Sequence, residues 1–283
     1  MGLAKQRGFN LNQSAINMTK KIAIIGGGNL GTAIAQGLVK SKMAKAPAIT
    51  ITRRNLSKLV YLSKEGFQLK SDNLDAVKKS ELIILCVQPK QLSALLSDIG
   101  LVLSAKHILV STVTGISTDE IASQLQKKIP IVRAMPNTAI AIGQSMTCLC
   151  AKDASERQLT EIKNLFDGLG KTLIVEERLM KAATVLAASG IAFFMRYVRA
   201  ATQGGIQMGF DAEEAQLIAA QTAKGAASLL LSRESHPEIE IDKVTTPEGC
   251  TIAGLNEMEH QGLSSALIKG IITSFDKINS IKK

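Results

Sequence analysis

The N-terminal half of the chain contains short, uninterrupted apolar runs that end in small, polar or proline-containing turns. Residues 21–25 form the first run, and Leu82–Val87, Ile108–Val110 and Ile131–Val132 repeat the pattern. A run that does not alternate with polar residues is typical of a strand buried on both faces of a parallel sheet. The residues between the runs can form the covering helices. The pattern therefore predicts an α/β fold with a doubly wound sheet.

Helical spacing replaces the strand pattern in the C-terminal part. Residues 178–208 predict one long, alanine-rich helix, interrupted near Ser189-Gly190 and Gly204-Gly205. A second helix follows the N-cap candidate Asp211, and a last pair of helices is separated near Gln261-Gly262. Small residues on so many helix faces predict close packing. We expect much of this all-α region to form a dimer interface.

A glycine-rich turn follows the first predicted strand at once, and a helical pattern begins directly after it. Gly26, Gly28 and Gly31 match the spacing G-x-G-x-x-G. The first glycine permits a tight turn, the second lets backbone approach a pyrophosphate, and the third lets the helix pack closely on the strand. The helix N-terminus adds donors and a positive dipole. In this context the motif predicts a Rossmann-type dinucleotide site.

The second predicted strand, residues 48–52, ends in Arg53, Arg54 and Asn55. A site that prefers NAD usually carries an acidic residue near this position to bind the ribose hydroxyls. Two guanidinium groups instead suit the 2′-phosphate of NADP. The sequence predicts that NADPH is preferred and that NADH is possible; the alternative is a pair of solvated loop arginines.

These patterns divide the chain into three parts. We expect residues 1–17, which lack apolar periodicity, to form a flexible extension ahead of the first strand. Residues 18–175 form the predicted NAD(P)-binding Rossmann domain. Residues 176–283 form the predicted helical domain for dimerisation and substrate binding.

Composition and charge exclude several other classes of protein. The formal net charge is +10, but the lysines are scattered singly and in pairs with almost no aromatic residues between them, which argues against nucleic-acid binding. No apolar run reaches the roughly 20 residues that span a bilayer, so no membrane partner is expected. The four cysteines form no C-x-x-C pair and have no histidine at ligand spacing. We therefore expect no metal site and a reducing, cytoplasmic location.

Several motifs together resemble the pyrroline-5-carboxylate reductase family over nearly the whole chain from Lys20. They are Ile25-Gly-Gly-Gly-Asn-Leu30, Cys86-Val-Gln-Pro89, Arg133-Ala-Met-Pro-Asn-Thr138, Ser235-His-Pro237 and Val244-Thr-Thr-Pro-Glu-Gly-Cys-Thr-Ile-Ala-Gly254. The resemblance implies NAD(P)H-dependent reduction of L-1-pyrroline-5-carboxylate to L-proline, the last step of proline biosynthesis. It also implies a homodimer or larger homo-oligomer that acts on a small cyclic imino acid.

The resemblance also implies which residues bind the two ligands. The cofactor contacts would be Ile25, Gly26, Gly27, Gly28, Asn29, Leu30, Asn73, Val87, Gln88, Pro89, Thr112, Val113 and Thr114. The substrate contacts would be Glu177, Thr246, Gly249, Cys250 and Thr251.

The expected reaction needs few catalytic side chains. A protonated cyclic imine is already an electrophile, so the enzyme mainly holds the nicotinamide at hydride distance from the imine carbon. Backbone N–H groups of residues 247–251 could hold the substrate carboxylate. The Thr251 hydroxyl could hydrogen-bond the ring nitrogen, which makes Thr251 the candidate catalytic residue. A threonine at a helix N-terminus is otherwise a simple cap.

Two positions depart from the family pattern. Glu248 replaces the first glycine of a common Pro-Gly-Gly sequence, and a backbone that requires a positive φ there would be strained. The long helix reads Ala187-Ala-Ser-Gly-Ile191 where the family usually has Ser-Gly-Ser-Gly-Pro. Both departures bear on substrate preference and leave the nucleotide-binding half unaffected.

Three other functions compete with this interpretation. A 3-hydroxyacid dehydrogenase would need a lysine base on the long helix with an asparagine one turn later, but Val185 stands at that position after Lys181. A reductase of a different cyclic imine would fit the altered substrate-side motifs. A non-catalytic NADP(H)-binding regulatory protein would keep the glycine loop without turnover.

Overall fold

A computed structural model describes residues 20–233 and 235–280, and its contacts divide the chain into two compact units. The first unit extends to Ala188 and the second covers Ser189–Ser280. The predicted extension over residues 1–17 lies outside the described residues.

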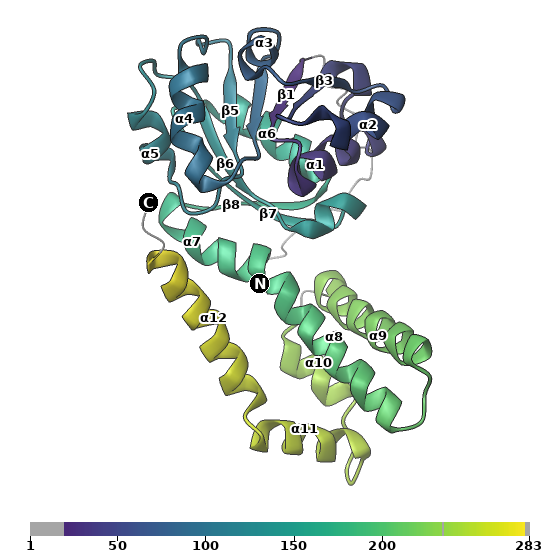
Figure 1. The fold of residues 1–283 in the computed structure, drawn as a ribbon. Coiled ribbons are helices and arrows are strands. Elements are labelled where there is room, and N and C mark those ends of the chain that lie inside the picture. Colours follow the sequence, from purple (N-terminus) through teal and green to yellow (C-terminus); the bar gives the residue numbers. More distant parts are fainter. Residues whose placement is uncertain (1–19, 234, 281–283) are drawn as a thin grey trace, which may run out of the picture. The chain divides into compact units, whose positions relative to one another are not determined.

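The first unit contains an eight-stranded sheet in the order β3-β2-β1-β4-β5-β6-β7-β8 (Figure 1). The strands are β1 (Ile22–Ile25), β2 (Ile49–Thr52), β3 (Gln68–Lys70), β4 (Leu82–Leu85), β5 (Ile108–Ser111), β6 (Ile131–Met135), β7 (Ser145–Lys152) and β8 (Gly170–Ile174). All neighbouring strands pair in parallel except β6 and β7, which are antiparallel. The α/β prediction with a doubly wound sheet is confirmed.

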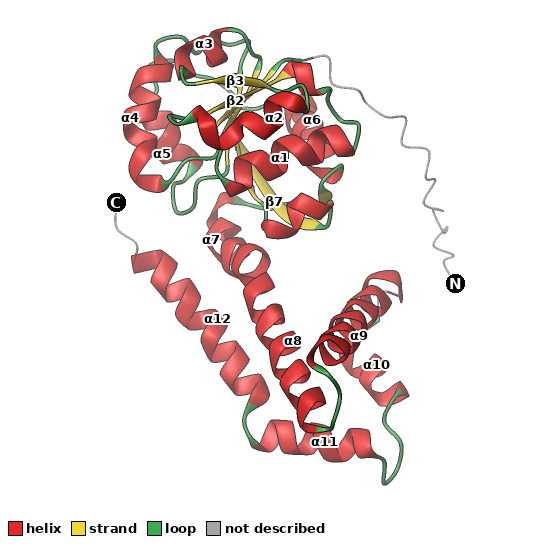
Figure 2. Ribbon diagram, turned by 45° about the vertical axis from the view of Figure 1, so that its right-hand side comes forward, coloured by secondary structure: helices red, strands yellow, loops and turns green. Residues whose placement is uncertain are grey.

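Helices cover both faces of this sheet (Figure 2). They are α1 (Asn29–Lys40), α2 (Val60–Lys64), α3 (Asn73–Lys78), α4 (Pro89–Gly100), α5 (Thr118–Ser123) and α6 (Glu156–Asp167). Four 3₁₀ turns accompany them: η1 (Ala46–Ala48), η2 (Leu56–Leu59), η3 (Thr138–Ile142) and η4 (Glu177–Leu179). Ile34 and Phe166 bury α1 and α6 against one face, whereas Leu92 and Ile121 bury α4 and α5 against the other. The two apolar layers explain why the strand sequences are apolar without alternation.

The chain after β8 remains part of the first unit for several turns. It forms η4, then α7 (Met180–Ala183) and a π-helical turn, η5 (Thr184–Ser189). Met180 is fully buried against Met135, Cys148 and Cys150. Because of this packing, the first compact unit ends at Ala188 rather than at the predicted boundary of 175.

The second unit is entirely helical within its described residues. It consists of α8 (Gly190–Gln207), α9 (Ala212–Arg233), α10 (Pro237–Lys243), α11 (Cys250–His260) and α12 (Leu263–Ser280). The predicted interruption near Ser189-Gly190 is confirmed by η5, whereas the one near Gly204-Gly205 is wrong because α8 continues through it. A Cβ on Gly205 would lie 2.9 Å from the Cβ of Ala215, so this glycine serves close helix packing.

Large apolar side chains remain exposed on the second unit. Phe194, Met195, Leu217 and Leu231 are among them. One described helical stretch, Glu177–Gln207, is long and apolar enough by length and composition alone to cross a membrane, and the core helices of soluble proteins share that property. Exposed apolar helix faces of this kind are typical of subunit interfaces.

We expect Gly170→Ala to destabilise the first unit by about 2 kcal/mol or more, because the backbone there has a φ of +147° and an added Cβ would lie 2.0 Å from the carbonyl oxygen of Ser145. Thermal unfolding followed by circular dichroism measures the effect. Gly100→Ala is the matched control, since its Cβ would make only an ordinary contact with Leu125 and alanine favours the helix. Equal melting temperatures for the two variants would contradict the assignment of strain at Gly170.

Candidate active site

The glycine-rich turn between β1 and α1 has the geometry of a dinucleotide-binding loop. The N–H groups of Gly26 and Gly27 both donate to the carbonyl oxygen of Thr52, at 3.2 and 2.7 Å, which joins the loop to the end of β2. Gly26 has a φ of +111°, and a Cβ on Gly31 would lie 2.2 Å from the Gly26 carbonyl oxygen. A Cβ on Gly28 would meet nothing within 4 Å. The loop is therefore closed on the protein side and open where a pyrophosphate would approach.

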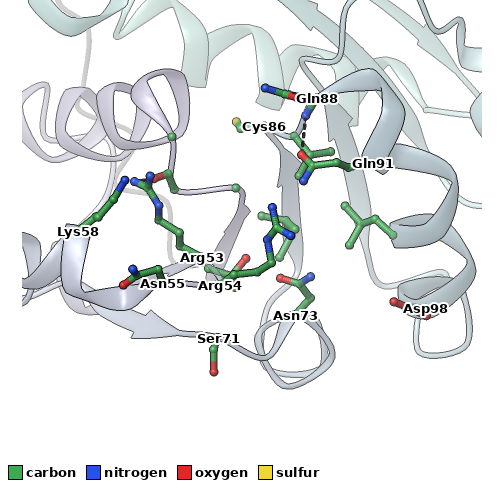
Figure 3. Close-up of a pocket in the computed structure, with 17 residues that line it drawn as sticks. Arg53, Arg54, Asn55, Lys58, Ser71, Asn73, Cys86, Gln88, Gln91 and Asp98 are labelled. Atoms are coloured by element: carbon green, nitrogen blue, oxygen red, sulfur yellow. Dashed lines mark hydrogen bonds between the residues drawn. The ribbon is translucent and has the colours of Figure 1, made fainter.

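A cavity of about 840 Å³ lies in front of this loop (Figure 3). It is lined by Ile25, Gly26, Gly27, Gly28, Thr52, Arg53, Arg54, Asn55, Lys58, Ser71, Asn73, Cys86, Val87, Gln88, Gln91, Leu95 and Asp98. The lining comes from the carboxyl ends of β1, β2, β3 and β4 and from the helices that follow them. In an open α/β sheet this edge is where a nucleotide binds, and the volume suits a cofactor.

The structure brings most of the predicted cofactor residues together at this cavity. Ile25, Gly26, Gly27, Gly28, Arg53, Arg54, Asn55, Asn73, Val87 and Gln88 line it. The other predicted residues do not line it: Asn29, Leu30 and Gly31 in the first turn of α1, Pro89 at the start of α4, and Thr112, Val113 and Thr114 after β5. The Thr112 hydroxyl donates to the Leu85 carbonyl at 2.9 Å, so it joins β5 to the end of β4.

Several residues that line the cavity were not predicted from the sequence. Thr52, Lys58, Ser71, Cys86, Gln91, Leu95 and Asp98 line the cavity but were not predicted as cofactor contacts. Lys58 lies in the 3₁₀ turn η2 directly after the two arginines, and its charge near them was the available signal. Ser71 follows β3, a three-residue strand that the apolar pattern did not predict.

The two arginines differ in what they contact. Arg53 Nη1 donates to the Gly27 carbonyl oxygen at 2.7 Å, which fastens the glycine loop to the end of β2. Arg54 has no ion pair or hydrogen bond of its side chain among the described residues. Figure 3 shows the two side chains diverging, with Arg53 near Lys58. Arg54 and Lys58 therefore leave positive charge available to a ligand in the cavity.

Cys86 at the end of β4 has no chemical role in this geometry. Burial raises the pKa of its thiol to about 12, although the Thr112 hydroxyl opposes the shift. The thiolate, which is the reactive form of cysteine, is therefore scarce at neutral pH. Cys86 forms part of the cavity wall.

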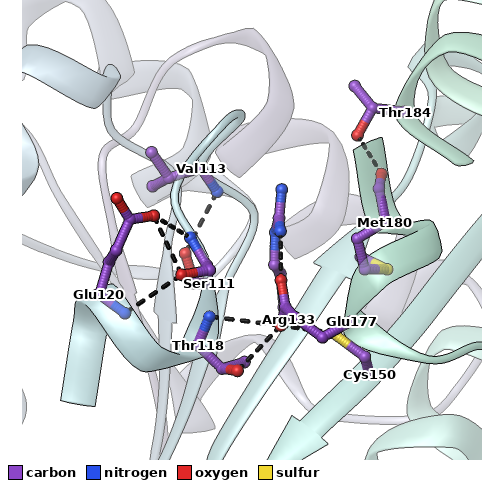
Figure 4. A network of polar contacts seen from close by, with 10 residues as sticks. Ser111, Val113, Thr118, Glu120, Arg133, Cys150, Glu177, Met180 and Thr184 are labelled. Atoms are coloured by element: carbon purple, nitrogen blue, oxygen red, sulfur yellow. Dashed lines mark hydrogen bonds and ion pairs between the residues drawn. The ribbon is translucent and has the colours of Figure 1, made fainter. Parts of the chain in front are cut away.

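A cluster of polar side chains surrounds Glu177, at the start of the long helical stretch (Figure 4). Arg133 Nη1 donates to Glu177 Oε1 at 2.6 Å, and the guanidinium is 2% exposed. Glu177 Oε2 accepts from the Thr118 hydroxyl at 2.8 Å and from Cys150 Sγ at 3.1 Å. Burial raises the pKa of the Glu177 carboxyl, but the hydrogen bonds from Cys150 and Thr118 and the charge of Arg133 outweigh it and hold the pKa below its usual value. Glu177 is thus a charged, well-partnered carboxylate within the first unit.

The predicted substrate loop belongs to the second unit. The Gly249 N–H donates a hydrogen bond to the Thr246 carbonyl oxygen at 3.0 Å. A Cβ on Gly249 would lie 2.5 Å from Thr246 Oγ1. Gly249 is the N-cap of α11, so Cys250 and Thr251 form its first turn. Glu248 has a φ of +57°, which confirms the strained backbone expected at this departure from the family pattern. The described residues give the Thr251 hydroxyl no hydrogen-bond partner, and they contain no cluster of His, Cys, Asp and Glu that could hold a metal.

Comparisons with known proteins agree with this arrangement. Residues 21–115 match the family model described as NADP oxidoreductase coenzyme F420-dependent, and residues 177–281 match the model described as pyrroline-5-carboxylate reductase dimerisation. Pyrroline-5-carboxylate reductase 1 of Dictyostelium discoideum is 52% identical over 272 residues, which cover 92% of this chain and 49% of the relative. The chain therefore spans about half the length of that relative.

Two further proteins match over nearly their full length. Pyrroline-5-carboxylate reductase 2 of Dictyostelium discoideum is 47% identical over 274 residues, which cover 91% of this chain and 92% of the relative. A solved structure of a pyrroline-5-carboxylate reductase from Coxiella burnetii matches with a TM-score of 0.86 at 28% identity, and the match covers 94% of this chain and 100% of that one. The chain belongs to the pyrroline-5-carboxylate reductase family.

Proposed function

We propose that this protein is an NAD(P)H-dependent oxidoreductase that reduces the C=N bond of L-1-pyrroline-5-carboxylate and so forms L-proline. The observation that carries the proposal is the match to a pyrroline-5-carboxylate reductase at 47% identity over 92% of its length. The cavity in front of the glycine loop supports it, since the lining residues fit a dinucleotide.

The residues divide the work between the two units. In the first unit the glycine loop and the ends of β2 and β4 bind the nicotinamide nucleotide, which supplies the hydride when bound. In the second unit the N–H groups at the start of α11 bind the substrate carboxylate, and Thr246 and Gly249 shape the loop. Thr251 lies in the first turn of α11. In the proposed complex, its hydroxyl hydrogen-bonds the ring nitrogen of the substrate. The imine is already electrophilic, so orientation is the main contribution of the protein.

Glu177 supports this arrangement rather than binding substrate directly. Both of its carboxylate oxygens already accept contacts from Arg133, Thr118 and Cys150. A carboxylate occupied in this way fixes the start of the helical stretch to the sheet. In the proposal, the role of Glu177 near the substrate is therefore indirect.

NADPH is the proposed preferred cofactor. Arg54 and Lys58 line the cavity beyond the end of β2, where the 2′-phosphate of the adenosine ribose would lie. Arg53 contributes by holding the glycine loop through the Gly27 carbonyl. A 2′-hydroxyl would gain little from the two free cations, whereas a phosphate would gain charge-assisted hydrogen bonds.

The proposed assembly is a homodimer or larger homo-oligomer in the cytoplasm. The exposed apolar side chains of the second unit supply the interface, and residues 177–281 match a dimerisation model. All four cysteines are free, as expected in a reducing compartment. No nucleic acid or membrane is a proposed partner.

A reductase of another cyclic imine is the second candidate, and Glu248 is the observation that favours it. Its carboxylate is one residue before the N-cap of α11, on a backbone with a φ of +57°. A negative charge there disfavours a carboxylate substrate. A cyclic imine without a carboxylate would avoid this repulsion.

The proposed reaction is tested by substrate-dependent oxidation of NADPH at 340 nm with L-1-pyrroline-5-carboxylate. We expect turnover by the wild-type protein. Thr251→Ala should lower kcat about 100-fold, because it removes the hydroxyl that is proposed to hydrogen-bond the protonated ring nitrogen. Thr251→Ser should retain most of the activity, and NADPH affinity should stay within twofold in both variants. Turnover only with a cyclic imine that lacks a carboxylate would favour the second candidate, and equal loss of kcat and NADPH affinity would make Thr251 a structural residue.

The proposed preference for NADPH gives different roles to the three cationic side chains near the end of β2, Arg53, Arg54 and Lys58. We expect Arg54→Ala and Lys58→Ala each to raise the KM for NADPH about 10-fold and to leave the KM for NADH nearly unchanged, because each loses a contact to the 2′-phosphate. Arg53→Ala should weaken both cofactors, since it releases the Gly27 carbonyl. Steady-state kinetics with each cofactor measures these values. A selective NADPH effect of Arg53→Ala without one at Arg54 or Lys58 would reverse the assignment.

The supporting role of Glu177 predicts a pH-dependent stability. Glu177→Gln should lower the free energy of unfolding by about 2–3 kcal/mol at pH 7, because a buried Arg133 then lacks its charged partner. The native pKa of Glu177 lies below the ordinary value of 4.5, so its stabilisation is present above pH 4.5 and is lost as the pH falls through the native pKa. The difference between variant and wild type should therefore shrink in acid.

Denaturant unfolding between pH 3 and pH 7 measures this dependence. The matched control is Glu176→Gln, since the neighbouring Glu176 pairs with Arg178 on the surface and such pairs contribute little. A Glu177→Gln effect that is independent of pH would show that shape, not charge, matters at this position.

A further inference from the structure

The helix α4 contributes a continuous stripe of side chains to the nucleotide cavity. Gln91, Leu95 and Asp98 all line the cavity, and residues at this spacing lie on one face of a helix. The stripe is about 10 Å long, because each residue of an α-helix advances the chain by about 1.5 Å. The cavity therefore extends along α4, beyond the turn that follows β4.

Asp98 differs in charge from the rest of the cavity lining. It is the only acidic residue among the described residues that line the cavity, whereas Arg53, Arg54 and Lys58 are cationic. The described residues give its carboxylate no ion pair and no hydrogen bond. Figure 3 shows Asp98 on α4, on the side of the cavity opposite Arg53 and Lys58. A hydrogen-bond acceptor without a protein partner thus stands apart from the cations.

The other two side chains of the stripe suit a flat heterocyclic base. Leu95 is 6% exposed and belongs to the same apolar cluster as Leu92 and Leu96, so it offers a fixed apolar surface. Gln91 Oε1 accepts from the Gln88 N–H at 3.1 Å, which leaves the Nε2 donors free of that bond. From the start of α4 onward, the stripe therefore offers a donor, an apolar surface and an acceptor.

The cavity corresponds to the adenosine half of a dinucleotide site. Its lining comes from the ends of β1, β2, β3 and β4, whereas Thr112, Val113 and Thr114 after β5 do not line it. A doubly wound fold binds the two nucleotides of the cofactor on its two halves, and the ribose that carries the 2′-phosphate lies near the end of β2. The base on that ribose must therefore occupy the part of the cavity beyond the phosphate-binding cations.

We propose that Asp98 is a specificity-determining residue for the cofactor, which selects adenine by accepting a hydrogen bond from its 6-amino group while the ring packs on Leu95. The inference rests on the proposed function, in which this cavity holds NADPH. Adenine carries an amino donor where guanine and hypoxanthine carry a carbonyl oxygen. A carboxylate accepts hydrogen bonds and donates none, so it stabilises the amino group and repels the carbonyl oxygen.

Asp98→Asn tests this assignment by a gain of binding. The asparagine amide can accept from a 6-amino group through Oδ1 or donate to a 6-oxo group through Nδ2. We expect wild-type protein to bind NADPH about 10-fold more tightly than the hypoxanthine analogue of NADPH. Asp98→Asn should bind the two cofactors within about threefold of each other, because its affinity for the analogue rises. Asp98→Ala should weaken NADPH binding about 10-fold and also lose the discrimination.

The two cofactors share the reduced nicotinamide, whose fluorescence follows both titrations without turnover. Asp119→Asn is the matched control, because it removes one negative charge from the same unit at an exposed position that pairs with Lys152 and does not line the cavity. This variant should keep the wild-type ratio of the two affinities. Tighter binding of both cofactors by the same factor in Asp98→Asn overturns the inference, since Asp98 would then act only through its charge.

The remaining outcomes separate this inference from the proposed reaction. Equal affinity of wild-type protein for NADPH and its hypoxanthine analogue overturns the inference and leaves the reaction standing. A preference for NADPH that Asp98→Asn abolishes, in protein that does not turn over L-1-pyrroline-5-carboxylate, refutes the reaction and supports the inference. Protein that binds neither cofactor overturns both.

Discussion

The nucleotide cavity depends on the close approach of α1 to the end of β1, which only glycine allows. The Gly26 carbonyl oxygen occupies the space that a Cβ on Gly31 would need, and the Thr52 carbonyl accepts from both Gly26 and Gly27. This one constraint fixes the N-terminus of α1 against the carboxyl ends of β1 and β2. The cavity walls follow, because the adjacent parallel strands end at the same edge of the sheet. Arg53 then secures the loop from outside through the Gly27 carbonyl.

The apolar pattern predicted the strands that are buried on both faces and also β2, but it missed β3. β1, β4, β5 and β6 have fully buried strand residues and were found as continuous runs. β3 is half-exposed and only three residues long, so its sequence carries little signal. Two glycines in the helical part have different structural roles. Gly190 directly follows a π-turn, whereas Gly205 packs against Ala215 within a continuous helix. Only tertiary packing distinguishes these two cases.

The candidate site was predictable where function requires a local backbone shape. The glycine loop and the positive φ of Glu248 are of this kind, because each is a property of a few consecutive residues. The remaining parts depend on contacts between distant segments. Nothing in the local sequence separates Arg53, which bonds the glycine loop, from Arg54, which faces the cavity. The partners of Glu177 likewise come from three separate elements, and its supporting role follows from them.

One family motif acquires a physical explanation from this geometry. The segment Arg133-Ala-Met-Pro-Asn-Thr138 lies at the end of β6, but none of its residues lines the nucleotide cavity. Arg133 bonds Glu177, Met135 packs on Met180, and Asn137 bonds the Ala187 carbonyl. Three side chains of one short segment thus hold successive points of the helical stretch from η4 to η5. The motif serves to attach that stretch to the sheet, and its constraint on sequence comes from the geometry of attachment rather than from contact with the nucleotide.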